Sequence, residues 1–189
     1  MPDSADINLP SIPTTAAELG ASLTTSQLTV TIFFGGFAVG QLFWGPIGDR
    51  YGRRGPVALG IGLFVLGSAG CALAGSAPAM ILWRMVQAVG ACAGVVLARA
   101  MVRDLHAGAR AAQMLSTLMT VMAVAPLLGP ILGAQILAWA GWRAIFWTLV
   151  GLGLLTLAAL RLLPETLHDS QKQPFNVRHL LRGYWQLSS

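Results

Sequence analysis

"GPIGDRYGRRG", residues 45–55, places one aspartate, three arginines and four glycines between two long apolar runs. The rest of the chain contains few charges: of its 189 residues, 10% are charged and 55% are hydrophobic. A water-soluble domain of this size could not easily cover so much apolar surface with polar side chains. We therefore expect an all-α integral membrane protein, with this charged stretch at a membrane edge.

Five apolar stretches meet or approach the roughly 20 residues that a helix needs to cross a bilayer. They cover residues 28–47, 57–77, 80–98, 114–140 and 144–160. A preceding segment, residues 5–20, is too short to span and contains an aspartate and two prolines. We interpret it as the second half of a helix whose first half is absent, so the first helix is expected to be truncated.

Basic residues collect in every second gap between these stretches. Nine of them follow the first, third and fifth stretches, whereas the alternate gaps hold only Arg143. The positive-inside rule then predicts that the loops at 49–56 and 103–112, and the C-terminus, are cytoplasmic. Because the formal charge of +5 lies in these gaps and not in a basic stripe with interleaved aromatic residues, we expect no nucleic-acid partner.

Nothing in the sequence indicates catalysis or metal binding. Cys71 and Cys92 lie inside apolar stretches without a CxxC pattern, and His106, His168 and His179 lie in the expected cytoplasmic segments. The chain has no HExxH motif, nucleophile elbow or phosphate-binding loop. We predict no enzyme, no metal and no cofactor.

Four motifs in order carry a resemblance to a known family. They are "GQLFWGPIGDRYGRR" (40–54), "LWRMVQAVGACAGVVLARAMVRDL" (82–105), "APLLGPILGA" (125–134) and "GWRAIFW" (141–147). Together they resemble the N-terminal half of a major facilitator superfamily drug:proton antiporter, and most closely the bicyclomycin and chloramphenicol resistance (Bcr/CflA) group. The resemblance implies the N-terminal six-helix domain of that fold, a 3+3 inverted repeat.

The same resemblance divides the chain into segments. It implies a partial helix 1 at 1–20, helices 2 to 6 at 26–48, 57–77, 79–102, 113–140 and 143–163, cytoplasmic loops at 49–56 and 103–112, and a linker at 164–189 that is cut before the second domain.

The function implied by the resemblance is proton-coupled efflux of hydrophobic drugs or antibiotics across the bacterial inner membrane. The expected partners are the lipid bilayer, drug-like molecules, protons that supply the energy, and a C-terminal transporter half that the chain lacks. Two alternatives stay open: a non-transporting fragment, or a half-size membrane subunit that needs a partner half. An importer of the same fold is disfavoured by the motif at 125–134.

The charged stretch supplies the first group of candidate site residues. Asp49 and Arg53 are four positions apart, a spacing that suits an ion pair if the helix continues that far. The resemblance implies a cytoplasmic latch that closes against the other half, formed by Gly45, Asp49, Arg50, Gly52, Arg53 and Arg54. The alternative is that the arginines only set topology and Asp49 is solvated.

Arg84 is the second candidate, because it lies inside its span near the expected outer side, and a guanidinium in lipid costs roughly 2.5–3.5 kcal/mol at a helix centre and less where it can snorkel. Gln87, Gly90 and Gly94 continue its helix face and are expected to point into the bundle. The resemblance links Arg84 to proton transfer, and it links Asp6, just before "NLP", to proton or cation binding. The alternatives are that Arg84 snorkels to the outer interface and that Asp6 has no function in this chain.

The stretch 125–134 resembles the motif that separates exporters from importers. Pro126 and Pro130 each remove a backbone donor and are expected to bend the helix, while Gly129 and Gly133 form a small-residue face. The alternative is an ordinary membrane helix kinked by proline.

A last group of charges ends the third full apolar stretch. Arg99 lies near the expected cytoplasmic end of its helix, followed by Arg103 and Asp104. We expect Arg99 either to snorkel or to join these two residues in a cytoplasmic charge network.

Overall fold

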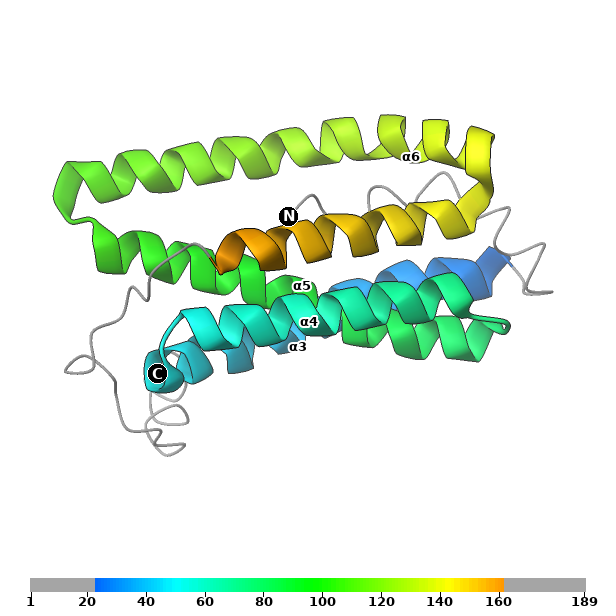
Figure 1. Cartoon of the computed structure of the whole chain (residues 1–189), viewed down its shortest axis with the longest axis horizontal. Helices are drawn as coiled ribbons and strands as arrows, with labels where there is room; N and C mark the ends of the chain where they lie inside the picture. Colours follow the sequence, from blue (N-terminus) through cyan, green and yellow to red (C-terminus); the bar gives the residue numbers. More distant parts are fainter. Residues whose placement is uncertain (1–22, 162–189) are drawn as a thin grey trace, which may run out of the picture.

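The computed structural model describes residues 23–161, which form four labelled helices (Figure 1). These are α3 (Leu23–Tyr51), α4 (Arg54–Leu73), α5 (Ala77–Leu105) and α6 (Gly108–Leu160). The partial helix expected at 1–20, with Asp6, and the linker expected at 164–189 lie outside the described residues.

Helix α6 is a hairpin of two helical arms. Its 53 residues would make a straight helix about 80 Å long, far more than the roughly 30 Å of a hydrocarbon core. The backbone leaves helical values at Gly141, where φ is 76° and ψ is 175°, a conformation that a residue with a side chain rarely adopts. The first arm, 108–140, and the second arm, 142–160, therefore run in opposite directions (Figure 1).

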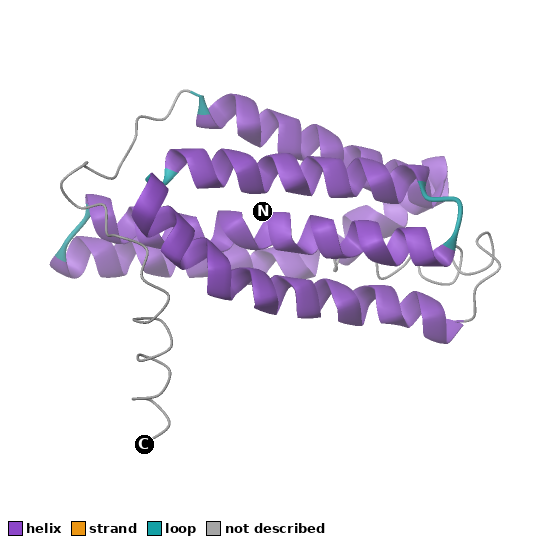
Figure 2. Cartoon of the chain, turned by 90° about the horizontal axis from the view of Figure 1, so that it is seen from below, coloured by secondary structure: helices purple, strands orange, loops and turns teal. Residues whose placement is uncertain are grey.

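All four helices are long and apolar enough to cross a membrane. Successive segments alternate in direction, so the short connections lie at the two ends of the bundle (Figures 1 and 2). The outer faces carry many exposed large apolar side chains, as expected where helices meet lipid and not water. The chain is a multi-pass membrane protein.

The loops are shorter than the sequence predicted. The expected loop at 49–56 is reduced to residues 52–53, because α3 continues to Tyr51 and α4 begins at Arg54. The expected loop at 103–112 is reduced to residues 106–107. The predicted bounds were wrong because they were placed where hydropathy falls, whereas charged residues such as Arg and Lys are good helix formers and continue a helix beyond its apolar section.

Helix α5 is the centre of the bundle and packs closely on α4 and α3. A Cβ atom at Gly60 of α4 would collide with the Cβ of Ala93, and one at Gly90 of α5 would collide with the backbone of Phe64. Small residues thus let the α4 and α5 backbones approach directly, as is common where membrane helices associate.

Two apolar clusters form the interior. One is nearer the Gly141 turn and joins all four helices; it includes Phe33, Phe64, Met80, Trp142, Ile145, Phe146 and Leu149. The other is nearer the opposite end; it includes Trp44, Val57, Ile61, Cys92, Leu97 and Leu160. The polar groups described next interrupt this otherwise apolar interior.

Candidate functional site

A chain of hydrogen bonds crosses from α5 to α4 inside the bundle. Arg84 Nη1 donates to Gln87 Oε1 at 2.9 Å, and Gln87 Nε2 donates to Ser68 Oγ at 2.8 Å. Ser68 Oγ in turn donates to the backbone carbonyl of Phe64, one turn earlier on α4, at 2.7 Å. We call Arg84, Gln87 and Ser68 the polar chain.

The polar chain is almost completely removed from the surface. Arg84 is 3% exposed, and Gln87 and Ser68 are both 0% exposed. Burial on this scale does not fit the alternative that Arg84 snorkels to the interface, because a snorkelling side chain keeps its charged end in the headgroup region. Gln87 and Gly90, expected on the same face, are buried with it, and Gly94 is half-buried.

Aromatic rings from two further helices cover the Arg84 guanidinium. Its Cζ lies 5.6 Å from the ring centroid of Phe33 on α3 and 5.0 Å from that of Phe146 on the second arm of α6. Both distances fall within the range of cation–π attraction. Arg84 therefore contacts side chains from α3, α5 and α6 directly, and it reaches α4 through Gln87.

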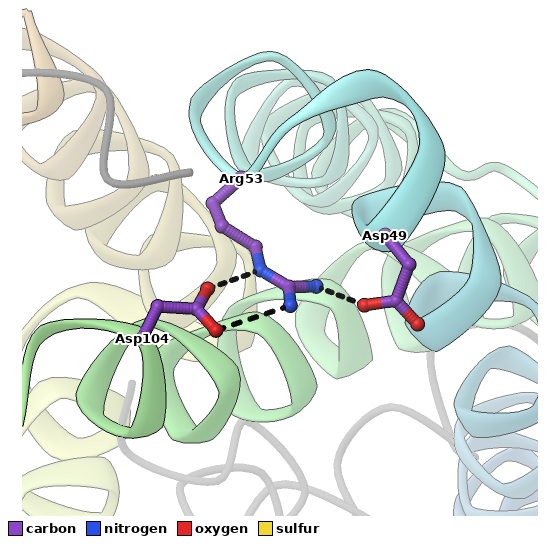
Figure 3. Close-up of polar contacts among 3 residues, drawn as sticks. All are labelled: Asp49, Arg53 and Asp104. Carbon is purple, nitrogen blue, oxygen red and sulfur yellow. Dashed lines mark hydrogen bonds and ion pairs between the residues drawn. The ribbon is translucent and has the colours of Figure 1, made fainter. Parts of the chain in front are cut away.

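A second buried arginine lies at the end of the bundle where α3, α4 and α5 meet. Arg53 Nη1 lies 2.7 Å from Asp49 Oδ1, and Arg53 Nε donates to Asp104 Oδ2 at 2.7 Å (Figure 3). The Arg53 side chain is 7% exposed, that of Asp104 17% and that of Asp49 52%. We call Asp49, Arg53 and Asp104 the loop triad.

The loop triad keeps Arg53 charged. Burial by itself lowers the pKa of the guanidinium, but the hydrogen bonds and negative charges of Asp104 and Asp49 outweigh burial and raise the pKa overall. Since even the unshifted pKa lies far above physiological pH, the triad retains its cation at any pH at which a cell grows.

Two glycines make room for this arrangement. Gly52 has a φ of 88°, which lets the chain reverse within two residues between α3 and α4. A Cβ atom at Gly48 would collide with Leu97 and lie only 2.9 Å from Arg53 Nη1. Gly48 thus packs within α3, whereas Gly52 lies beyond the end of α3 and forms the turn.

The remaining residues of the charged stretch have separate surroundings. Arg54 Nη2 donates to the backbone carbonyl of Arg161 at 2.8 Å, which ties the start of α4 to the end of α6. Arg50 lies over the ring of Tyr51, with 5.1 Å between Cζ and the centroid. Gly45 has open space where its Cβ would be.

The charged residues near the end of α5 are arranged differently from the prediction. Asp104 pairs with Arg53 across the bundle, so it is not used by Arg99 or Arg103. Arg99 is half-buried, with Nη2 4.0 Å from the sulfur of Met122, and Arg103 is exposed. The expected network of Arg99, Arg103 and Asp104 was wrong because α3 and α5 end side by side, which brings the loop arginine to Asp104.

The stretch 125–134 keeps helical backbone values, and the bend expected there stays a prediction. The helix continues through Pro126 and Pro130, and the backbone break within α6 falls at Gly141. Gly129 and Gly133 are both buried, as a small-residue face requires. A proline removes one backbone hydrogen bond, whereas a positive φ reverses the chain, so the glycine dominates the shape.

Three contacts could not be read from spacing alone. Sequence reasoning missed Ser68, the ring pair Phe33 and Phe146, and the pairing of Arg53 with Asp104, because each joins different helices. Ser68 did leave a signal: it is a polar residue flanked by small residues in "GSAG" (67–70), and polar groups within a span usually face protein. Within residues 23–161, no cluster of three His, Cys, Asp or Glu could hold a metal ion.

Comparison with known proteins identifies the family of this chain. The model of the Major Facilitator Superfamily matches residues 4–186. The chain is 42% identical over 165 residues to a chloramphenicol resistance protein of Pseudomonas aeruginosa, covering 85% of the chain and 39% of that protein. It is 34% identical over 184 residues to a bicyclomycin resistance protein homologue of Haemophilus influenzae, covering 97% of the chain and 46% of that protein.

A solved structure agrees on the fold. The xylose transporter XylE from E. coli, in an inward-open conformation, superposes with a TM-score of 0.69 at 19% identity, covering 97% of this chain and 48% of XylE. The chain thus spans less than half the length of the proteins it matches.

Proposed function

Because the chain belongs to the major facilitator superfamily, we propose that it is the N-terminal half of a proton-coupled exporter of hydrophobic drugs in the bacterial inner membrane. The names of its relatives, which refer to chloramphenicol and bicyclomycin resistance, support the substrate class. The stretch 125–134, which resembles the exporter motif, supports the direction of transport.

The observation that carries the proposal is the buried guanidinium of Arg84 in the interior of an apolar bundle. Ionisable groups inside membrane proteins are costly and commonly lie on ion or substrate pathways. Arg84 would electrostatically tune a proton-binding carboxylate, and we propose Asp6, outside the described residues, for that carboxylate. Proton binding there would compete with drug binding and drive export.

The loop triad would serve as the cytoplasmic latch. We had expected its partner surface to lie in the second half of the transporter, but Arg53 is already paired with Asp49 and Asp104 within this half. We therefore propose that the triad first holds the ends of α3, α4 and α5 together. Asp49, whose side chain is 52% exposed, is the member available to a second half.

Efflux in cells tests the transport proposal. Deletion of the gene at its native locus should raise chloramphenicol accumulation, and a protonophore should raise it equally in the undeleted strain. Arg84→Ala should match the deletion while the protein stays in the membrane at its usual amount. Arg103→Ala, which removes an exposed arginine from the same helix, is the matched control. Unchanged accumulation after deletion would refute the exporter, and normal efflux by Arg84→Ala would refute the coupling role.

Sidedness has its own test. The two native cysteines, Cys71 and Cys92, are both 0% exposed, so an introduced cysteine can be labelled selectively. A cysteine placed at Arg103 should react with a membrane-impermeant maleimide only in inverted vesicles. Labelling in intact spheroplasts would contradict a cytoplasmic loop.

A half-size subunit that needs a partner is the second candidate, favoured by relatives more than twice as long as the matched region. Expressing the 189-residue chain alone, and then together with the unmatched C-terminal part of the Pseudomonas relative, separates the two cases. Efflux only in the co-expressing strain supports the need for a partner half. Efflux from the chain alone excludes it.

A further inference from the structure

We infer that Ser68 is a positioning residue for Arg84: by fixing which end of the Gln87 amide faces the guanidinium, it orients the cation. The inference rests on the proposed function for its consequence in transport. It concerns a residue on a different helix from Arg84, with no contact to the guanidinium among the described hydrogen bonds.

The direction of the hydrogen bonds carries the first step. A hydroxyl has one proton to donate, and Ser68 donates it to the carbonyl of Phe64 at 2.7 Å. Ser68 Oγ can then only accept, so it binds the Gln87 amino group at 2.8 Å. With its NH₂ held there, Gln87 must present Oε1 to Arg84, the end that can accept from a cation.

The reverse orientation of the amide would place two donors against each other. If Ser68 gave its proton to Gln87 Oε1, the Gln87 amino group would face the guanidinium, and both are donors only. An unmatched buried donor costs about 1–3 kcal/mol. The Ser68 bond to its own helix therefore selects the single arrangement that binds Arg84.

Backbone packing makes this selection rigid. A Cβ atom at Gly67, the residue before Ser68, would lie 2.5 Å from the Gln87 backbone nitrogen and 2.6 Å from its Cα. Helix α4 thus touches the α5 backbone at the residue that Ser68 binds, which fixes the separation of the two side chains. The rings of Phe33 and Phe146 attract the cation but impose little direction, so among these contacts the hydrogen-bonded chain sets its orientation.

Nitrogen-15 NMR of the arginine side chains in the full 189-residue chain tests the inference directly. The Arg84 signals are assigned by their loss in Arg84→Lys. In the wild type we expect separate Nη signals from a guanidinium that rotates slowly. In Ser68→Ala we expect merged signals and about tenfold faster hydrogen exchange at Arg84. Wild-type Arg84 signals in folded Ser68→Ala would overturn the inference.

Two further variants keep the test decisive. Thr156→Ala removes a hydroxyl that donates to a carbonyl four residues earlier, as Ser68 does, but on an exposed face; it should leave Arg84 unchanged. Gln87→Met breaks the polar chain at the next bond and should reproduce the Ser68→Ala spectrum. If Ser68→Ala does not fold, Ser68→Cys, which keeps a similar shape but is a weak donor and acceptor, decides in its place: wild-type Arg84 signals there refute the inference, and mobile ones support it.

Transport kinetics then separate this inference from the proposed function. In a transporting cell, Ser68→Ala should lower the maximal efflux rate several-fold and leave KM nearly unchanged. The reason is that the variant loses the orientation of the Arg84 guanidinium and does not lose a contact with the drug. A mobile Arg84 in Ser68→Ala, in a protein that never exports drug, would refute the proposed function and leave the positioning role intact. A changed KM with an unchanged maximal rate would refute the positioning role in transport.

Discussion

Among residues 23–161, two arginines are buried, and the structure holds them by different means. Arg84 is 3% exposed and lies against an amide and two aromatic rings, whereas Arg53 is 6% exposed and lies between two carboxylates. The first is deep between apolar helices, and the second is at a bundle end where two acidic residues converge.

The comparison shows how one residue type can serve two purposes. At the bundle end, paired charges lock the ends of three helices together with directional contacts. In the interior, the Arg84 guanidinium donates to an amide oxygen and lies against two aromatic rings. Three predictions, in order of expected effect, test this contrast.

Arg53→Met should have the largest effect on stability. It leaves the Asp49 and Asp104 carboxylates without their shared cation, and breaking a buried pair costs about 3–5 kcal/mol. Because Asp49 is half exposed, we expect a loss of about 2–3 kcal/mol in the free energy of unfolding, measured by SDS titration in mixed micelles. Arg103→Met, an exposed arginine, should cost less than about 0.5 kcal/mol. Equal losses in the two variants would remove the distinction between the triad and a surface charge.

Gly67→Ala should come next and should act where α4 packs against α5 beside the polar chain. The added methyl group meets the Gln87 backbone, and such overpacking costs about 1–3 kcal/mol. The matched control is Gly62→Ala on the same helix, where the new Cβ meets open space; it should be neutral or slightly stabilising. The same micelle titration compares the two, and a neutral Gly67→Ala would mean that α4 and α5 are less tightly apposed at Gln87.

The smallest losses in the free energy of unfolding are expected at the two acids of the loop triad, and the two losses should differ. Asp104→Asn, at the less exposed carboxylate, should cost about 1–2 kcal/mol, while Asp49→Asn should cost about 0.5 kcal/mol. Salt sharpens the contrast: raising ionic strength to about 1 M should nearly abolish the Asp49 effect and retain most of the Asp104 effect. The opposite ranking would show that the exposed acid anchors Arg53.

Much of the architecture was predictable because hydropathy and charge act locally. A run of apolar residues spans a membrane whatever its neighbours are, and the motifs at 40–54, 82–105, 125–134 and 141–147 identified the family. Arg84 and Gln87 were predicted as interior residues for a similar reason, since a charge within a span must avoid lipid. The loop bounds at 49–56 and 103–112 failed because hydropathy locates the end of the hydrocarbon and not the end of the helix.

Partner assignments failed where they depended on how helices meet. Asp104 was assigned to the arginines nearest in sequence, yet it pairs with Arg53, 51 residues away. Local chemistry allowed several partners for Asp104, and packing selected one.

The sequence by itself determined that this chain crosses a membrane several times, that it belongs to a transporter family, and that Arg84 and Arg53 are unusual. The membrane spans and the unusual arginines follow from composition and spacing, and the family follows from the resemblance of four motifs and the match to the family model; all are fixed before any two helices touch. Only the tertiary structure decided that Ser68 orients Gln87 and that Arg53 joins Asp49 to Asp104. Hydrogen bonds and ion pairs extend about 3 Å, so their partners are set by which helix faces come together.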